Sequence, residues 1–280
     1  MNYMRYIGII MTVHNRKVKT LECLKRIESL HIPDGYAIET YLTNDGCTDG
    51  TPEAIKATFP HVNIIEGDGS LFWNRGMYAA WQEAAKSDFD YYLWLNDDTF
   101  LYDNTLDRLL KTSNELDNKA IILGTTCDTY TKSIVTYGGK TKDGKYAYSD
   151  VKPSQCIYMN GNIVLIPKHV FDIVGYNDPY YSHAMGDYDY GLMAVKKNIN
   201  IYTAPGFCGE CDLHEQVSTW KDPKKPLKTR WKALFKPTGA NPFEYFYYRH
   251  KHFGIIAACK TFISNFAHVL FPQFWTPDKR

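Results

Sequence analysis

Two adjacent carboxylates follow the most apolar short segment of the chain. Residues 91–95 read Tyr-Tyr-Leu-Trp-Leu, and Asp97 and Asp98 come after them, past Asn96. A short continuous apolar run is typical of a strand buried on both faces, and ligands of open α/β sheets bind beyond the carboxyl ends of the strands. Adjacent carboxylates repel each other, so we expect a positive group beside them, and a hard divalent cation suits oxygen ligands. A strand-ending turn in which Asp caps a helix is the alternative.

Three further polar loops follow the first three expected strands. They are residues 12–16 (Thr-Val-His-Asn-Arg), 44–51 (Asn-Asp-Gly-Cys-Thr-Asp-Gly-Thr) and 67–76 (Gly-Asp-Gly-Ser-Leu-Phe-Trp-Asn-Arg-Gly). The second loop places the Asp45 carboxylate where a ribose or a base edge could be hydrogen-bonded. The third lacks the last glycine of the dinucleotide fingerprint and the lysine of a P-loop, which disfavours an NTPase. We expect all these loops to meet Asp97 and Asp98 at one edge of the sheet.

Two later segments carry groups capable of chemistry. Asp187 and Asp189 lie near an expected helix start, where a carboxylate either compensates the helix dipole or acts as a general base toward a hydroxyl. Cys208, Cys211 and His214 could bind a metal, but a structural zinc site needs a fourth ligand and usually a second paired motif. The sequence offers neither, so zinc is not favoured.

The elements that must position these loops alternate in the first half of the chain. We expect strands at residues 6–13, 38–43, 62–65 and 91–95, and helices at 18–30, from 51, at 74–86 and at 103–116. This order predicts a parallel sheet with helices on both faces. In the second half we expect strands at 121–126, 133–137, 146–148, 156–165 and 199–203, helices at 167–174, 187–197 and within 242–271, and a basic mobile loop at 221–232.

Composition excludes some classes of function. The chain has 32 basic and 31 acidic residues and a formal charge of +1. It therefore lacks the net positive charge that would attract nucleic acid. Seven dispersed cysteines indicate a reducing compartment. We expect no signal peptide and no transmembrane helix, hence a cytoplasmic protein. Residues 254–275 are apolar but interrupted, and we expect them to close the core, with a peripheral contact at the inner face of a membrane as the alternative.

The ordered motifs together resemble the family-2 glycosyltransferases of GT-A fold. They are TVHNR, NDGCTDGT, GDGSLFWNRGM, LWLNDDT, GDYDYGLM, a later His, and YYRH at residues 247–250. The likeness is greatest to bacterial rhamnosyltransferase-like and galactofuranosyltransferase-like members, and it weakens after about residue 220. It implies an α/β fold with a Rossmann-like nucleotide-binding sheet, a mixed-sheet acceptor half and C-terminal helices. The implied division is a transferase domain at 1–220 and a basic loop with packed helices at 221–280.

The resemblance implies roles for residues on the first three loops. Thr12, His14 and Arg16 would line the nucleotide pocket, and Asp45 would hold the base or the ribose. Trp73 and Arg75 would sit near the donor sugar and the nucleotide.

The resemblance also implies a cation site and a catalytic base. Asp98, with Asp97 beside it, would coordinate Mg²⁺ or Mn²⁺ on the diphosphate, and His214 matches a position that completes the metal site in some members. Asp187 aligns with the catalytic base, with Asp189 just behind it. Two departures matter: Asn96 replaces the first Asp of the D-x-D motif, and Gly186 replaces the usual Glu before the base. They leave the choice between Asp187 and Asp189 open, and we favour Asp187.

The implied reaction moves a sugar from a UDP- or dTDP-sugar to a hydroxyl of a glycan or lipid-linked glycan, with inversion, in surface polysaccharide synthesis. A non-catalytic sugar-nucleotide or glycan-binding protein of the same fold is the alternative outside enzymes. A sugar nucleotidyltransferase would require a glycine-rich phosphate loop directly after the first strand, and residues 12–17 contain no glycine. A D-x-D-x-T phosphatase fails because Asn96 stands at the nucleophile position. Residues 221–232 are interpreted as a solvated loop, with a lid or a lipid contact as alternatives.

Overall fold

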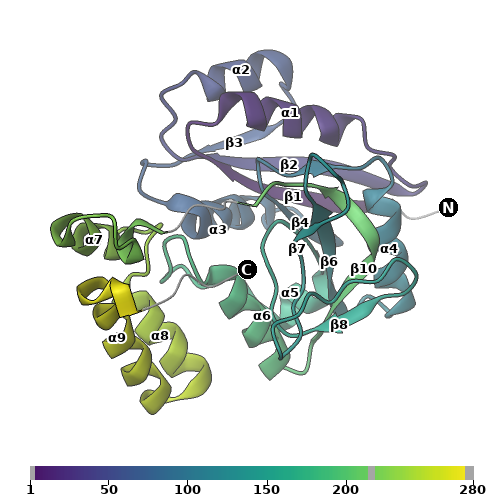
Figure 1. Cartoon of the computed structure of the whole chain (residues 1–280). Helices are drawn as coiled ribbons and strands as arrows, with labels where there is room; N and C mark the ends of the chain where they lie inside the picture. The colour runs from purple at the N-terminus through teal and green to yellow at the C-terminus, as the bar shows by residue number, and fades with distance from the viewer. Residues whose placement is uncertain (1–3, 214–217, 275–280) are drawn as a thin grey trace.

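One mixed β-sheet of ten strands runs through the molecule, and helices cover both of its faces (Figure 1). The computed structural model describes residues 4–213 and 218–274. The strands are β1 (Arg5–Val13), β2 (Tyr36–Asn44), β3 (Asn63–Glu66), β4 (Tyr91–Leu95), β5 (Phe100–Leu101), β6 (Ala120–Cys127), β7 (Val135–Tyr137), β8 (Ser154–Cys156), β9 (Ile163–Pro167) and β10 (Asn200–Glu210). The helices are α1 (Lys17–Glu28), α2 (Thr51–Thr58), α3 (Phe72–Ala84), α4 (Thr105–Glu115), α5 (Lys168–Val174), α6 (Gly186–Lys196), α7 (Leu227–Leu234), α8 (Pro242–Phe253) and α9 (Ile255–Leu270), with short 3₁₀ turns at Thr219–Lys221 and Pro272–Phe274.

The order of the strands confirms the predicted division of the sheet. The main path is β3-β2-β1-β4-β9-β6-β10-β5, with β7 paired to β6 and β8 to β10. Strands β3, β2, β1 and β4 are mutually parallel, as the alternation of strands and helices predicts. Strand β9 then runs antiparallel to both β4 and β6, which makes the second half mixed. The carboxyl ends of β1, β2 and β4 therefore open on one edge.

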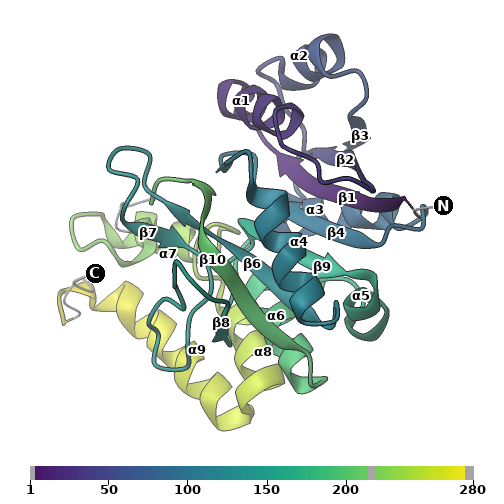
Figure 2. The same ribbon diagram turned by 90° about the vertical axis from the view of Figure 1, so that its right-hand side faces the viewer.

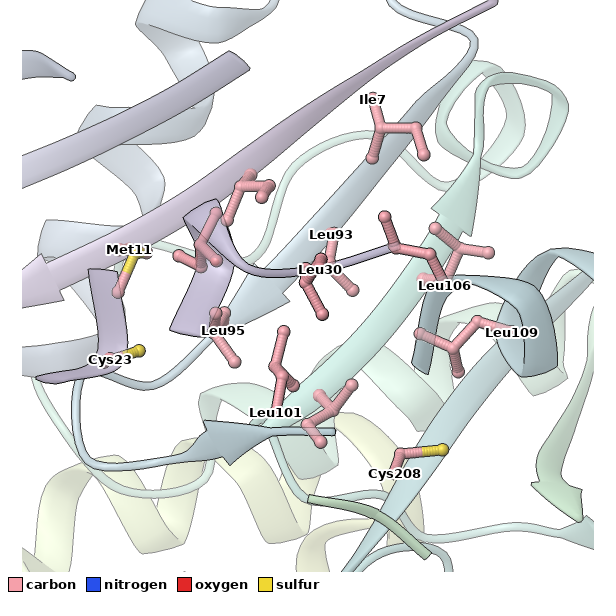
Figure 3. Close-up of a cluster of buried hydrophobic side chains, with 14 of the residues drawn as sticks. Ile7, Met11, Cys23, Leu30, Leu93, Leu95, Leu101, Leu106, Leu109 and Cys208 are labelled. Carbon is pink, nitrogen blue, oxygen red and sulfur yellow. The ribbon is translucent and has the colours of Figure 1, made fainter. Parts of the chain in front are cut away.

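The pleat of the buried strands divides the core into two layers. In β4, Leu93 and Leu95 join the cluster that packs against α1, α2 and α4, whereas Tyr92 and Trp94 join the cluster with α3, α5 and α6. Figure 3 shows the first cluster, in which Met11 of β1 and Cys23 of α1 lie beside Leu95. A strand buried on both faces is what the continuous apolar run at 91–95 predicts.

The prediction of one strand over residues 156–165 is wrong. The structure has β8 ending at Cys156, a loop, and β9 beginning at Ile163. The polar sequence Asn160-Gly161-Asn162 breaks the apolar run, and Asn162 provides the carbonyl that accepts the Asn96 N–H at 3.1 Å. This interruption brings a loop of the second half next to the end of β4.

Other expected strands differ in extent. Residues 146–148 form no strand, since Tyr146 makes only an isolated bridge with Lys140. The strand expected at 199–203 is the longer β10, which continues past Pro205 and Gly206 by irregular pairing with β6. The two-residue strand β5 lies directly after the Asp pair and has no periodic signal in the sequence. The predicted helices of the first half are all present.

The basic segment 221–232, predicted to be a loop, contains the start of helix α7. Pro226 precedes the first helical residue, where its fixed backbone angle favours a helix start. Leu234 is fully buried, and Arg230, one turn earlier, is buried with it. The exposed lysines of α7 obscure this pattern in the sequence, because the buried positions are few and one of them is Arg230.

Helices α8 and α9 pack side by side at the end of the molecule opposite α1 and α2 (Figures 1 and 2). Hydrogen bonds from Ser182 N and Oγ to buried Glu244 tie α8 to the segment before α6. No helix in residues 4–213 or 218–274 combines the length and apolarity needed to cross a bilayer.

Candidate functional site

The loops after β1, β2 and β4 meet at one polar edge, as predicted. Val13 pairs with Asn44 at the ends of β1 and β2, and Ile10 pairs with Trp94 of β4. The first two loops touch directly, because His14 Nδ1 lies 2.6 Å from the backbone oxygen of Asp45. A carbonyl only accepts, so in the neutral ring Nδ1 carries the proton and Nε2 accepts from Asn15 Nδ2 at 3.3 Å.

Arg16 supplies the positive charge expected beside the carboxylate pair. Its Nη1 lies 2.7 Å from Asp98 Oδ2, and its Nη2 contacts Asp97 Oδ1. Both carboxylates are buried, and the Thr20 hydroxyl lies 3.0 Å from Asp97 Oδ2. Burial nevertheless raises the pKa of Asp97 to about 6, against the lowering effect of Arg16. The first loop and the end of β4 are thus joined by a charged contact.

The other side of the pair is lined by a thiol and an amide. Cys211 Sγ lies 3.9 Å from Asp98 Oδ1, and Asn162 Nδ2 reaches both Cys211 Sγ (3.5 Å) and Thr99 Oγ1 (3.2 Å). Burial, with the Asp98 charge adding to it, raises the pKa of the Cys211 thiol to about 12. The thiol is therefore protonated at neutral pH.

The donors at this edge fit a hard divalent cation. Asp97 and Asp98 offer carboxylate oxygens with a net negative charge, the ligand type that Mg²⁺ and Mn²⁺ take. Among residues 4–213 and 218–274, no three His, Cys, Asp or Glu side chains converge as a ready-made metal site. His214, the expected further ligand, lies outside the described residues.

Asp45 holds the third loop in place. Its Oδ1 accepts from the N–H groups of Gly69 (2.9 Å) and Leu71 (3.2 Å), and its Oδ2 accepts from Phe72 N–H (2.8 Å). A Cβ on Gly46 would lie 2.7 Å from Gly69 Cα, so the second and third loops are in backbone contact. The buried carboxylate therefore fixes the approach of the loop to the start of α3.

Trp73 bridges the Asp pair and the segment that carries Asp187. Its Nε1 donates to Asn96 Oδ1 at 2.7 Å, directly before Asp97. A Cβ on Gly161 would lie only 2.3 Å from the Trp73 ring and 3.5 Å from Asp187 Cβ. Gly161 thus lets the indole and Asp187 share one wall of the site.

Asp187 is a carboxylate at the start of α6 with a perturbed titration. Its Oδ2 accepts from Gly161 N–H (3.0 Å) and its Oδ1 from Tyr188 N–H (2.8 Å). The side chain is partly exposed, yet loss of solvation raises its pKa to about 6, more than these hydrogen bonds lower it. A carboxylate with this pKa matches a general base near neutral pH.

Asp189, two residues further along α6, has a different environment. It is fully buried, and its oxygens are met by Tyr181 OH (2.9 Å), Lys251 Nζ (2.8 Å) and His252 Nε2 (2.7 Å). These partners belong to the segment before α6 and to α8. Asp189 therefore serves as an anchor between helices, and no open face is left for a substrate hydroxyl.

The remaining predicted residues lie near the same edge in supporting contacts. Thr12 is buried beneath α3, where a Cβ on Gly76 would lie 2.2 Å from its hydroxyl oxygen. Arg75 Nε donates to the Pro179 backbone oxygen at 3.0 Å, and its Nη2 reaches the Tyr180 oxygen at 3.2 Å.

Four residues of the site escaped sequence reasoning. Asn74 is buried and donates to the backbone oxygens of Asp178 and Tyr181, while Asn162, Gly161 and Glu244 make the contacts given above. Each lies in a polar or small-residue stretch whose partners are distant in the sequence, so no local spacing identifies it. For Gly161, the break in the apolar run 156–165 is the signal that could have found it.

Comparison with known proteins gives a family and a fold. Residues 8–171 match the model of the family described as glycosyl transferase family 2. No curated protein matches this chain. The solved structures that match include a mannosyltransferase, PcManGT from Pyrobaculum calidifontis, in complex with GDP-Man and Mn²⁺, at 14% identity and a TM-score of 0.57, covering 95% of this chain and 76% of that one.

Two further matches have similar values. TarS of S. aureus aligns with a TM-score of 0.60 at 12% identity, covering 95% of this chain, which spans only 55% of the TarS chain. GalNAc-T7, solved with UDP, GalNAc and Mn²⁺, aligns with a TM-score of 0.58 at 13% identity, covering 95% of this chain and 58% of that one. A shorter TarS chain, residues 1–349, was solved with UDP-GlcNAc. At these identities the likeness concerns the fold.

Proposed function

This chain belongs to glycosyl transferase family 2 and has the GT-A fold, and from that premise we propose that it transfers a sugar from a UDP- or dTDP-sugar to a hydroxyl group, with inversion at the anomeric carbon. The observation that carries the proposal is one polar edge where a buried carboxylate pair and the partly exposed Asp187 are linked through Trp73. The acceptor we propose is a glycan or lipid-linked glycan of surface polysaccharide synthesis, made on the cytoplasmic side of a membrane.

The donor nucleotide would lie over the loops after β1 and β2. His14 and Arg16 present polar groups at this edge, Thr12 and Asp45 fix the loops beneath, and Trp73 and Arg75 would face the sugar end. Asp45 accepts hydrogen bonds from three N–H groups of the third loop and so positions that loop. A ribose hydroxyl of the donor would add to these contacts. Neighbours of this fold bound to GDP-Man and to UDP-GlcNAc support a nucleotide-sugar donor.

Asp98, with Asp97 beside it, would hold Mg²⁺ or Mn²⁺, and we retain His214 as a further proposed ligand. A divalent cation, when bound, offsets the charge that the departing diphosphate gains. A cation on Asp97 and Asp98 would compete with Arg16 for these carboxylates, and a displaced guanidinium would be free to face a phosphate.

Asp187 would act as the general base. It accepts the proton of the attacking hydroxyl while the bond from the sugar carbon to the diphosphate breaks on the opposite face, so one displacement inverts the centre. Its two backbone hydrogen bonds fix the carboxylate, and its raised pKa makes it a stronger base than an exposed Asp. Asp189 is the weaker candidate because its oxygens are taken by three protein groups.

A donor screen tests the proposal. The full chain is incubated with UDP-, dTDP- and GDP-sugars and Mn²⁺ or Mg²⁺, and nucleotide binding and sugar release are measured. We expect one nucleotide sugar to bind and to be hydrolysed slowly, with Asp98→Ala abolishing both and the exposed Asp143→Asn changing neither. Binding without turnover, even with glycan acceptors, would favour a non-catalytic binding protein. Turnover of a nucleoside triphosphate with a sugar phosphate would favour a nucleotidyltransferase.

A further inference from the structure

The charge of this chain is divided very unevenly along its length. Residues 1–218 contain 20 Lys and Arg against 28 Asp and Glu, a net charge of −8, whereas residues 219–280 contain 12 against 3, a net charge of +9. The overall charge of +1 conceals this division. The basic part coincides with the helices α7, α8 and α9, which lie together at one end of the molecule (Figure 1).

Helix α9 carries an apolar stripe that no described residue covers. Ile256, Ile263 and Leu270 are spaced by seven residues, which places them on one side of the helix. Ile256 is 71% exposed and Ile263 68% exposed. Another side of α9, which includes Ala258 and Val269, is buried, and α9 contacts both α7 and α8. Exposed apolar side chains that gather on one side of a helix mark an interaction surface.

The stripe continues onto α7 and α8 through aromatic rings. Trp231 of α7, itself 42% exposed, packs against Phe266 of α9 with ring centroids 5.5 Å apart. Phe266 lies between Ile263 and Leu270 along the helix. Phe243 of α8 extends the surface through Phe262 at 5.9 Å. We call the exposed apolar side chains of Trp231, Phe243, Ile256, Ile263 and Leu270 the apolar face.

Buried hydrogen bonds fix α7 against α9. The Arg230 side chain is buried, and its Nε donates to the Val269 backbone oxygen at 3.0 Å. Asn265 Nδ2 of α9 also reaches the backbone oxygen of Ala240, in the loop before α8, at 3.4 Å. These contacts hold the inner side of the helices, so the exposure of the apolar face does not come from a loosely packed helix.

Exposed lysines lie on α7, which carries Trp231 of the apolar face, and in the turns that flank this helix. Lys224, Lys225, Lys228, Lys232 and Lys236 are all exposed, and within the described residues none of them forms an ion pair. Apolar side chains bordered by lysines are typical of surfaces that lie at the interface of an anionic bilayer.

We propose that α7, α8 and α9 dock this protein on an anionic lipid bilayer through the apolar face, with the lysines of α7 and its flanking turns at the lipid headgroups. A second copy of the chain is a poorer occupant, because a symmetric contact would bring two units of net charge +9 together. Docking of this kind leaves the helices on the surface. The inference goes beyond the proposed transfer reaction, since binding to vesicles is measured without donor or acceptor.

Vesicle co-sedimentation of the full chain tests this inference. The probes are vesicles of phosphatidylcholine alone and of phosphatidylcholine with about 30% phosphatidylglycerol. We expect the partition coefficient to be at least about tenfold higher for the anionic vesicles and to fall with added salt. Ile256→Asn with Ile263→Asn should lower it about tenfold or more, and so should Lys228→Glu with Lys232→Glu.

Matched variants elsewhere on the surface serve as controls. Ile134→Asn with Val151→Asn removes exposed apolar groups from the acidic part, and Lys142→Glu with Lys145→Glu reverses exposed charges there; both should bind as the parent does. Equal binding to both vesicles, no binding to either, or an equal loss in the controls would overturn the inference. A dimer in light scattering that Ile256→Asn with Ile263→Asn dissociates would also overturn it, in favour of a second copy.

Discussion

At the scale of single residues, the environment separates two carboxylates that the sequence leaves equivalent. Asp187 and Asp189 lie two positions apart near the start of α6. The first is partly exposed beside Gly161 and Trp73, whereas the second is buried with Lys251 and His252 against it. The difference comes from α8, some 60 residues later in the chain, which no local pattern could reveal.

Replacing Asp187 tests its role as the base. We expect Asp187→Asn to lower kcat by about 10²–10⁴-fold while nucleotide affinity stays within about threefold, because the amide cannot accept the proton. Asp189→Asn is the comparison: it should lower the free energy of unfolding by about 2–4 kcal/mol, since it removes the carboxylate that buried His252 and the partly exposed Lys251 share. Its effect on kcat of the folded fraction should be smaller. Normal transfer by Asp187→Asn would make Asp189 the candidate base.

The titration of Asp187 predicts a pH dependence. Its pKa is raised to about 6, and a base must be deprotonated, so kcat/KM should fall about tenfold per pH unit below about pH 6 and level off above it. The measurement is initial rate against pH, with circular dichroism to show that the chain stays folded. A limb at the pKa of an exposed Asp, near 4, would contradict this assignment.

Arg16 is the residue on which charge balance at the Asp pair depends. Arg16→Gln should lower the free energy of unfolding by about 1–3 kcal/mol, less than for a fully buried pair because the Arg16 side chain is 39% exposed. Mn²⁺ should then raise the Tm of the variant more than that of the parent, since a cation can replace the lost charge. Arg26→Gln, from the exposed pair with Glu22, is the control and should cost under about 1 kcal/mol. An equal response to Mn²⁺ in both proteins would argue against a cation at this pair.

At the scale of elements, the first half of the fold is predictable because its signals are local. Apolar runs ending in polar loops locate β1, β2 and β4, and their parallel order places the loops on one edge. The second half is less predictable, because its boundaries depend on tertiary contacts. The strand predicted at 156–165 is interrupted by a loop in which Gly161 meets Trp73. Helix α7 replaces a predicted loop because Arg230 and Leu234 are buried against α9.

The contact of that loop with α3 gives a prediction about an element boundary. Gly161→Ala would place a Cβ 2.3 Å from the Trp73 ring, so the indole must move and release Asn96. We expect kcat to fall about 10–100-fold and the free energy of unfolding to fall by about 1–3 kcal/mol. Trp73→Phe, which removes the Nε1–H donor and keeps most of the ring, separates the hydrogen bond from the packing. Unchanged activity in Gly161→Ala would mean that the shared wall has no part in catalysis.

At the scale of the whole molecule, the residues proposed to bind the donor lie at one edge of the sheet. The basic helices α7, α8 and α9 lie together at one end of the molecule. The two regions are connected, since α8 supplies Glu244 to Ser182 and Lys251 to Asp189 in the segments flanking Asp187. The sequence shows the charge division by counting alone, but only the packing of α7, α8 and α9 separates exposed from buried apolar residues.

Binding of donor nucleotide and cation at the polar edge should stabilise the folded chain as a unit. A ligand at about 100 times its Kd adds about 2.7 kcal/mol, which for a chain of this size raises Tm by about 5 °C. We expect this shift with UDP or dTDP only when Mn²⁺ or Mg²⁺ is present, and we expect Asp98→Ala to remove it, because the carboxylate pair would hold the cation against the diphosphate. Differential scanning fluorimetry with each nucleotide, with and without EDTA, measures the effect. Asp143→Asn should shift as the parent does, and a full shift in EDTA would contradict the cation's part in binding.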